Sequence, residues 1–184
     1  MELDVKKMRG YAHEVFETAK SHGWHEERLS DISYIGLAMT EAAEAVNADR
    51  RSLRCSSSHL MHVLGIRNDS LYILNFDKYV KDSVEDEIAD IVIRLIDYAY
   101  LRWGEDMDWN AFDDECHPNP QGSFVENYYM LTKRVMNTYA GAVCHGIRFC
   151  YEWAKQLGID LDAHIQAKMR YNKLRPYKHG NKKY

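Results

Sequence analysis

The chain has 184 residues, of which 46% are hydrophobic and 28% charged, and its formal net charge is -4. This length and composition fit a single globular domain over residues 1–184 with a substantial core, and they exclude a largely disordered chain. The charge is unevenly distributed, because residues 168–184 hold seven Lys or Arg and no acid. An acidic body with so small a basic C-terminal tail disfavours nucleic acid as a partner.

Targeting and redox signals are absent from the sequence. The N-terminal segment is charged, and no apolar run approaches the roughly 20 residues of a membrane span, so we expect no signal peptide, no membrane association and a cytoplasmic location. The four cysteines form no C-x-x-C pair, which argues against a zinc ribbon or a thioredoxin-like motif. Cys55, His59 and His62 are spaced like three zinc ligands, but no fourth ligand joins them.

Two helices are predicted in the first part of the chain. Apolar residues recur at helical spacing over residues 3–22, and Gly23 ends that run. The second predicted helix runs to about Ala48, and either Ser30 or Asp31 can cap its start.

Residues 50–79 then form an insertion before the next helix. Its aromatic and β-branched patch, Leu71–Phe76, predicts either a short strand or a helical turn covering one end of a bundle. A third helix is predicted over Val80–Trp103, and residues 104–123 form an acidic connection with proline and glycine.

The last part of the chain is again helical in pattern. Residues 124–157 read as helix, with a possible break near Gly141 or Gly146, and a last helix starts near residues 159–161 and ends at Arg175. The predicted fold class is therefore all-α, a bundle of four to six helices with an inserted segment between its second and third helices.

Two short acidic motifs carry the main functional signal. They are Glu41-x-x-Glu44 and Glu87-x-x-Asp90, each inside a predicted helix. Carboxylates three residues apart on a helix lie about one turn apart on one face, so each motif directs two oxygen ligands to one side. Hard cations prefer oxygen ligands, and the two motifs together predict a site for Mg²⁺, with Mn²⁺ as a substitute.

The two motifs differ in their surroundings. Glu41 shares an arc with Tyr34 that is continuous with the apolar face of its helix, so it points inward or along a seam. A carboxylate there is costly unless a cation or hydrogen bonds compensate it. Glu87 and Asp90 lie with Arg94 outside the apolar stripe of their helix, and a solvated face explains them equally well.

Other helical or nucleotide-binding sites fit the sequence less well. A di-iron carboxylate bundle requires Glu-x-x-His on two helices, and no Glu here has a His three residues later. Neither a P-loop nor a G-x-S-x-G elbow is present. Because Mg²⁺ usually shares its coordination shell with water and substrate phosphates, the acidic motifs point to a phosphorylated substrate.

Candidate substrate contacts lie near both ends of the chain. The basic residues that could meet phosphate oxygens are Lys168, Lys173, Arg175 and Lys182. Asn172 could hydrogen-bond a phosphate, a sugar or a base. Trp24 and His25 are either a loop aromatic beside a solvated histidine or a wall of a nucleotide pocket, where an indole can stack on a base.

The paired motifs resemble the signature of the MazG-like all-α nucleoside triphosphate pyrophosphohydrolases, which are related to the dimeric dUTPases. Three longer stretches resemble the same family: residues 19–25, 84–94 and 168–180. Two departures are visible. Residues 45–86 form a longer spacer than is usual, and Thr40 stands where many members carry a further acid.

The resemblance implies Mg²⁺-dependent hydrolysis of an NTP or dNTP to the monophosphate and pyrophosphate. The implied metal and catalytic residues are Glu41, Glu44, Glu87 and Asp90, with Glu44 slightly favoured as the base. The implied substrate contacts are Lys168, Asn172, Arg175 and Lys182 for the phosphates, and Trp24 and His25 for the sugar or base. The resemblance also implies a homodimer or homotetramer.

Two other functions remain open from the sequence. The same scaffold could bind nucleotide and metal without turnover. Alternatively, the acids could be a solvated face of a helical interaction protein whose basic tail binds a partner or nucleic acid.

Overall fold

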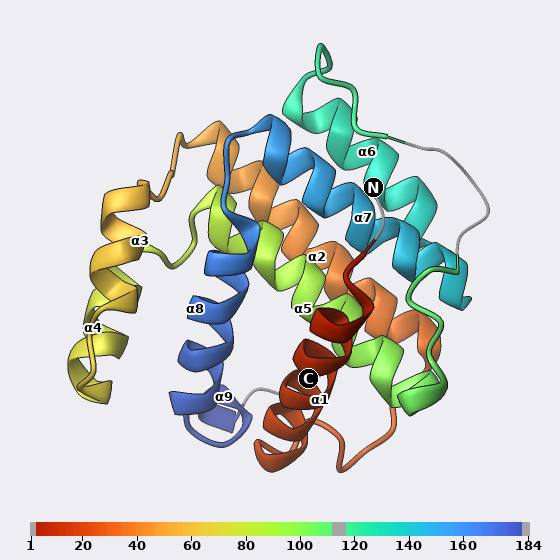
Figure 1. Cartoon of the computed structure of the whole chain (residues 1–184), viewed down its shortest axis with the longest axis horizontal. Coiled ribbons are helices and arrows are strands. Elements are labelled where there is room, and N and C mark those ends of the chain that lie inside the picture. Colours follow the sequence, from red (N-terminus) through yellow and green to blue (C-terminus); the bar gives the residue numbers. More distant parts are fainter. Residues whose placement is uncertain (1–2, 112–116, 182–184) are drawn as a thin grey trace.

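A computed structural model of the chain describes residues 3–111 and 117–181, and within these ranges it contains helices and no strand (Figure 1). The elements are α1 (Val5–Ser21), α2 (Asp31–Arg50), α3 (Ser57–Leu64), α4 (Asp69–Tyr79), α5 (Val84–Trp103), the 3₁₀ turn η1 (Gly104–Asp106), α6 (Phe124–Val135), α7 (Ala140–Gln156), α8 (Leu161–Leu174) and α9 (Lys178–Asn181). The all-α prediction is confirmed. None of these described helices is long and apolar enough to cross a membrane.

Six of the helices, α1, α2, α5, α6, α7 and α8, form the bundle (Figure 1). Helix α5 is its central element, because it packs against α1, α2, α7 and α8. Most of its side chains are buried, including acidic residues in its first turn. Any site built on the polar residues of α5 is therefore enclosed by several helices.

Serine caps define where several helices begin. The side chain of Ser30 accepts from the backbone of Ser33, so of the two candidates Ser30 caps α2. Ser83 caps α5 in the same way. The predicted start of that helix at Val80 is wrong by about one turn, because Asp82 has a φ of 60° and interrupts the helical backbone.

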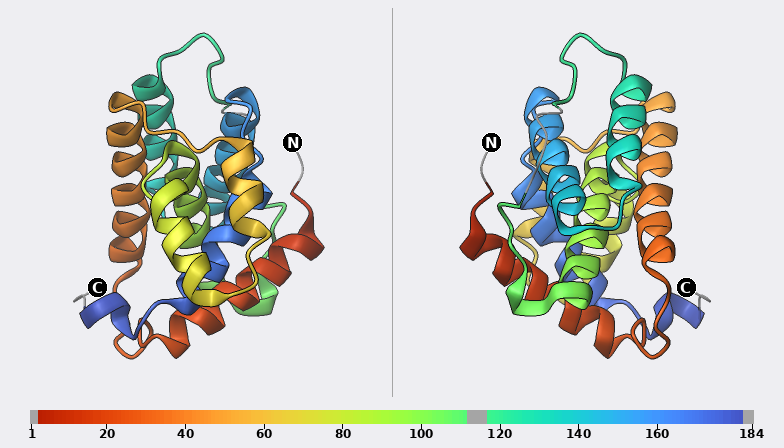
Figure 2. Two further views of the ribbon diagram at one scale, coloured as in Figure 1. Left: turned by 90° about the vertical axis from the view of Figure 1, so that its left-hand side faces the viewer. Right: turned by 90° about the vertical axis from the view of Figure 1, so that its right-hand side faces the viewer.

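The insertion between the acidic motifs folds as two helices, α3 and α4. The patch Leu71–Phe76 lies in α4, so of the two structures predicted for it, a strand or a helical turn, the helical one is right. The Phe76 ring stacks on Tyr171 of α8 with 4.2 Å between centroids. The Tyr72 hydroxyl donates to the Ala167 carbonyl at 2.6 Å. Figure 2 shows α3 and α4 together at one side of the bundle. The insertion thus has a small core of its own against α8.

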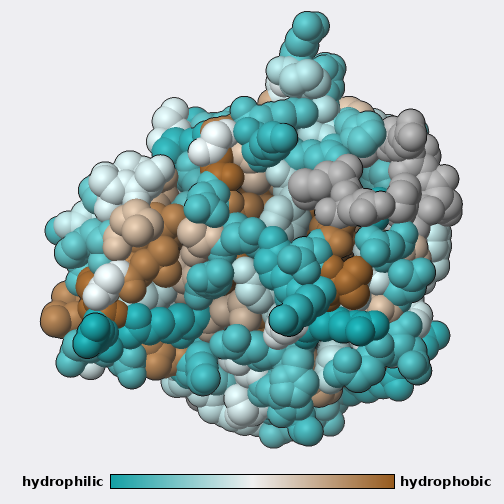
Figure 3. Space-filling model, in the orientation of Figure 1, coloured by the Kyte–Doolittle hydropathy of each residue, from teal (hydrophilic) through white to brown (hydrophobic). Residues whose placement is uncertain are grey.

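The outer side of the insertion is partly apolar. Met61, Leu71 and Leu74 are exposed there, and Figure 3 shows hydrophobic surface over α3 and α4. Single exposed apolar residues are common on soluble proteins, so this surface alone defines no site.

The helical region 124–157 is broken, but not at a glycine. The break lies at residues 136–139, between α6 and α7. Gly141 and Gly146 both lie inside α7. A Cβ on Gly146 would lie 2.5 Å from the Val135 side chain, so the glycine serves close packing of α7 against α6 rather than a helix end.

Candidate metal centre and adjoining pocket

Two antiparallel helices, α2 and α5, position most of the candidate site (Figure 1). Each carries four site residues at positions i, i+3, i+7 and i+10, which fall on one helical face. These are Tyr34, Leu37, Glu41 and Glu44 on α2, and Glu87, Asp90, Arg94 and Asp97 on α5. Because the helices are antiparallel, the acidic ends of the two rows meet, and so do the ends with Tyr34 and Asp97.

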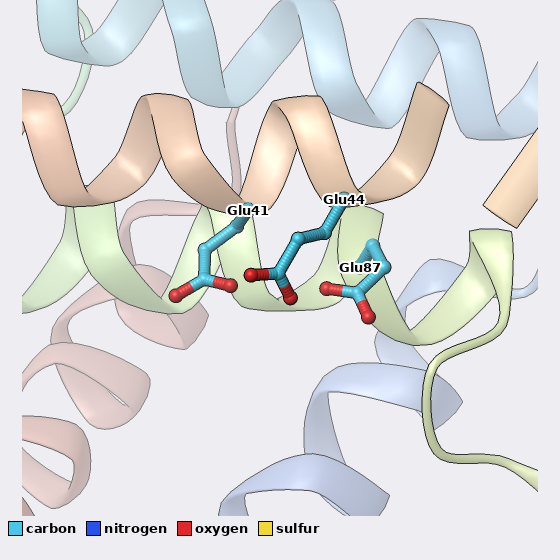
Figure 4. A group of neighbouring side chains, drawn as sticks. All are labelled: Glu41, Glu44 and Glu87. Carbon is cyan, nitrogen blue, oxygen red and sulfur yellow. The ribbon is translucent and has the colours of Figure 1, made fainter. Parts of the chain in front are cut away.

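The acidic end brings three of the four predicted ligands together. Glu41, Glu44 and Glu87 each offer an oxygen, and these atoms all lie within 4.8 Å of one another. Figure 4 shows the three carboxylates directed to the same side of α2. Glu41 and Glu87 are buried, at 8% and 3% exposed, whereas Glu44 is exposed. The inward direction predicted for Glu41 is confirmed, and the alternative of a solvated face is wrong for Glu87.

The negative charges of the two buried glutamates, Glu41 and Glu87, are balanced to different extents by neighbouring groups. Arg94 Nε donates to Glu41 Oε1 at 2.9 Å. Burial and the nearby Asp90 nevertheless raise the pKa of Glu41 to about 6. Glu87 has no side-chain hydrogen bond or ion pair within the described residues, and burial, followed by repulsion from Asp86 and Asp90, raises its pKa to about 9. At neutral pH and without a cation, Glu87 therefore holds a proton.

The fourth predicted ligand has a different partner. Lys168 Nζ lies 2.7 Å from Asp90 Oδ2 and 2.8 Å from Asp86 Oδ2, and the lysine side chain is only 6% exposed. Burial lowers the pKa of Lys168, but the two carboxylates more than offset this and hold it above its usual range. In the structure α8 packs on α5 and pairs Lys168 with Asp90, and the roles of Lys168 as a phosphate clamp and of Asp90 as a metal ligand stay predictions.

The donor set of the three glutamates fits a hard cation. It consists of carboxylate oxygens alone, which suit Mg²⁺ or Mn²⁺ better than softer metals. The buried and unpaired Glu87 carboxylate is also a group whose charge a cation would compensate. Among the described residues, this cluster is the one group that meets the distance requirement for a metal site.

The spacing that suggested zinc does not produce a site. The Cys55 thiol donates to the Ser56 carbonyl at 3.6 Å, while His59 stacks on Tyr79. His62 lies 3.3 Å from the Asn75 side-chain oxygen. Burial and the charges of nearby acids raise the pKa of the Cys55 thiol to about 11, which disfavours the thiolate that zinc requires.

Two adjoining pockets reach Arg94, whose side chain pairs with Glu41 of the acidic cluster. Both are lined by Ala19, Trp24, Arg94 and Asp97. The first is also lined by Asp90, Asn172, Arg175 and His179, and the second by His25, Tyr34 and Lys178. Four predicted substrate residues, Trp24, His25, Asn172 and Arg175, therefore line a pocket.

The remaining basic candidates are placed elsewhere. Lys168 lines neither pocket. Lys173 is exposed on α8, and Lys182 lies outside the described residues. Of the basic residues predicted to meet phosphates, Arg175 is the one that the structure brings to the pocket.

His25 is enclosed rather than solvated. Its Nε2 lies 3.0 Å from Asp97 Oδ1, and the side chains of the two residues are 7% and 14% exposed. Its ring stacks on Phe16 with 5.0 Å between centroids. Because a carboxylate only accepts hydrogen bonds, Nε2 is the donor, while Nδ1 is buried without a partner in the described part of the chain.

Sequence reasoning placed Arg94 beside the second motif without a role, and it missed Asp97. Extending the row of Glu87, Asp90 and Arg94 by one helical turn would have found Asp97. The resulting site has an acidic end that suits a cation and a pocket with aromatic, basic and amide side chains.

No known family model, curated protein or solved structure matches the chain.

Proposed function

We propose that the chain is a Mg²⁺-dependent nucleoside triphosphate pyrophosphohydrolase, which releases the monophosphate and pyrophosphate. The observation that carries the proposal is the convergence of Glu41, Glu44 and Glu87 within 4.8 Å, beside a pocket lined by Asn172 and Arg175. The resemblance of the acidic motifs to the MazG-like family supports the same activity. Mn²⁺ would substitute for Mg²⁺ at a site built from oxygen ligands.

The three glutamates would have different roles at the acidic end. Mg²⁺ bound there would neutralise phosphate charge and lower the pKa of the attacking water. Glu41 and Glu87 are buried and suit the role of ligands, and Arg94 fixes the position of Glu41. Glu44 is exposed and has no ion pair within the described residues, so it is best placed to take a proton from the water.

Residues of the pocket would hold the rest of the substrate. Arg175 would pair with phosphate oxygens, and Asn172, whose Oδ1 is buried without a partner among the described residues, would hydrogen-bond the substrate. Trp24 offers an indole face for stacking. Lys168 would act as a positioning residue, because it holds Asp90 and Asp86 against α8.

The test is a product analysis with a panel of ribo- and deoxynucleoside triphosphates and Mg²⁺. We expect monophosphate and pyrophosphate from at least one of them, with activity lowered about 10²-fold or more in Glu44→Gln. Glu14→Gln, at an exposed position of α1, is the matched control and should retain full activity. Formation of diphosphate and phosphate, or equal activity in the two variants, would contradict the proposal.

A second candidate is a non-catalytic nucleotide and metal binding module. The ion pair of Asp90 with Lys168 favours it, because this pair leaves three carboxylates rather than four for cations. It predicts thermal stabilisation by nucleotide with Mg²⁺ and no turnover. The third hypothesis, in which the acids form a solvated face, conflicts with the burial of Glu41 and Glu87. The homodimer or homotetramer and the cytoplasmic location stay predictions.

A further inference from the structure

We propose that the pocket beside Trp24 selects a nucleobase that carries an exocyclic amino group, through the hydrogen-bond-accepting carboxylate of Asp97. The inference rests on the proposed function for the phosphate end of the substrate. It adds a specificity-determining residue, Asp97, and a class of base to that function.

The position of Asp97 separates it from the acidic cluster. Asp97 follows Glu87 by ten residues on α5, which corresponds to about 15 Å along the helix axis. Tyr34 precedes Glu44 by the same interval on the antiparallel α2. With the phosphates at the acidic end, the part of the substrate beside Asp97 and Tyr34 is therefore the base.

The pocket at this end contains a carboxylate with one oxygen that lacks a donor. Asp97 Oδ1 accepts from His25 Nε2, and no other hydrogen bond to the Asp97 carboxylate occurs among the described residues. The second carboxylate oxygen, Oδ2, therefore has no donor within the same ranges, and Asp97 lines both pockets. An N–H donor from a ligand would pair this oxygen.

The walls of the same pocket suit a flat aromatic group. Trp24, His25 and Tyr34 all line it. Stacking on such side chains does not distinguish one base from another, because every base has a π-face. Discrimination between bases must therefore come from hydrogen bonds to their edges.

Amino-bearing bases match the Asp97 acceptor, and their oxo counterparts do not. Cytosine and adenine present an N–H₂ donor where uracil and hypoxanthine present a carbonyl oxygen. A carbonyl oxygen directed at the Asp97 carboxylate would place two acceptors against each other and leave both unpaired. Sites built to hydrogen-bond one group reject an analogue that lacks it much more strongly than apolar pockets reject a change in size.

The test is calorimetric binding of nucleoside monophosphates to the metal-free protein, so that it requires no turnover. CMP is compared with UMP, and AMP with IMP, because each pair differs at the amino position. In the pair that binds more tightly, we expect the amino member to have a Kd about tenfold lower or better. Equal affinities, tighter binding of the oxo member, or no binding of any of the four would overturn the inference.

A variant assigns the preference to one residue. Asp97→Asn retains the size of the side chain and introduces an amide donor, so the preference for the amino base should disappear or reverse. Asp106→Asn, at an exposed position of η1, is the matched control and should keep it. Thermal unfolding of each variant reports on folding. The wild-type comparison tests the inference even where Asp97→Asn fails to fold, and failure to hydrolyse any triphosphate would instead count against the proposed function.

Discussion

Lys168 Nζ and Asp90 Oδ2 lie 2.7 Å apart in the interior, where they join α8 to α5. The contact fixes the orientation of the second half of α8. Asn172 and Arg175 follow Lys168 by about one and two helical turns, so the same face of the chain continues into the pocket. The ion pair therefore links the acidic side of α5 to the residues proposed to hold the substrate.

Removing the lysine charge should destabilise the fold. Lys168→Met leaves the buried Asp86 and the half-buried Asp90 without their cation, and breaking a buried pair in this way costs about 3–5 kcal/mol. Lys173→Met, on an exposed position of the same helix, should change stability by less than about 0.5 kcal/mol. Urea unfolding measures both. A loss under about 1 kcal/mol in Lys168→Met would show that the pair is not buried in solution.

The metal-free protein should lose stability as the pH rises. Glu87 ionises near 4.5 in the unfolded chain and at about 9 in the folded one. Between these values the folded state binds more protons, so its free energy of unfolding falls with increasing pH. Glu87→Gln should be more stable than the wild type at pH 8 in EDTA, by on the order of 3 kcal/mol. A difference that is the same at pH 5 and pH 8 would contradict the buried, protonated Glu87.

Cation binding should release protons. Glu41 and Glu87 have pKa values raised to about 6 and about 9, and both must be ionised to act as ligands. Mg²⁺ affinity should therefore increase between pH 7 and pH 8.5, by up to about tenfold per pH unit. Calorimetry in two buffers of different ionisation enthalpy measures the protons released. A Kd that is flat over this range, or equally steep in Glu87→Gln, would be evidence against the site.

Two glycines should respond in opposite directions to alanine. A Cβ on Gly146 would lie 2.5 Å from Val135 and 3.1 Å from Leu95, so Gly146→Ala should destabilise the protein by about 1–3 kcal/mol. Gly10, inside α1, has no atom within 4 Å of such a Cβ. Gly10→Ala should therefore stabilise the protein by about 0.5–1 kcal/mol through helix propensity. Thermal unfolding compares the two, and an unchanged melting temperature in Gly146→Ala would refute the close packing.

Local periodicity was sufficient for most helices and for one of the two acidic motifs. Glu41 could be placed correctly because it continues the apolar face of its own helix. Glu87 lies outside the apolar stripe of α5, and its burial depends on how other helices pack against α5. Such long-range packing leaves no local periodic signal, so the sequence left two alternatives open for Glu87.

The same limit applies to the basic tail and explains the error in the helix break. Lys168 belongs to a basic stretch of sequence, but its partners on α5 lie far away in the chain, so the local charge pattern does not indicate these ion pairs. Gly146 carries the local signal of a helix breaker. In the fold, however, the space that it leaves is filled by Val135 of α6, and α7 continues through it.

The most direct test of the metal centre is a Mn²⁺ titration of the nucleotide-free protein, followed by electron paramagnetic resonance. We expect the wild type and Glu14→Gln to bind Mn²⁺ and reduce the signal of the free ion. Glu41→Gln and Glu87→Gln should bind at least about tenfold more weakly, because each removes a buried ligand from the cluster. Equal binding by all four proteins would contradict the assignment of Glu41, Glu44 and Glu87 as the metal centre.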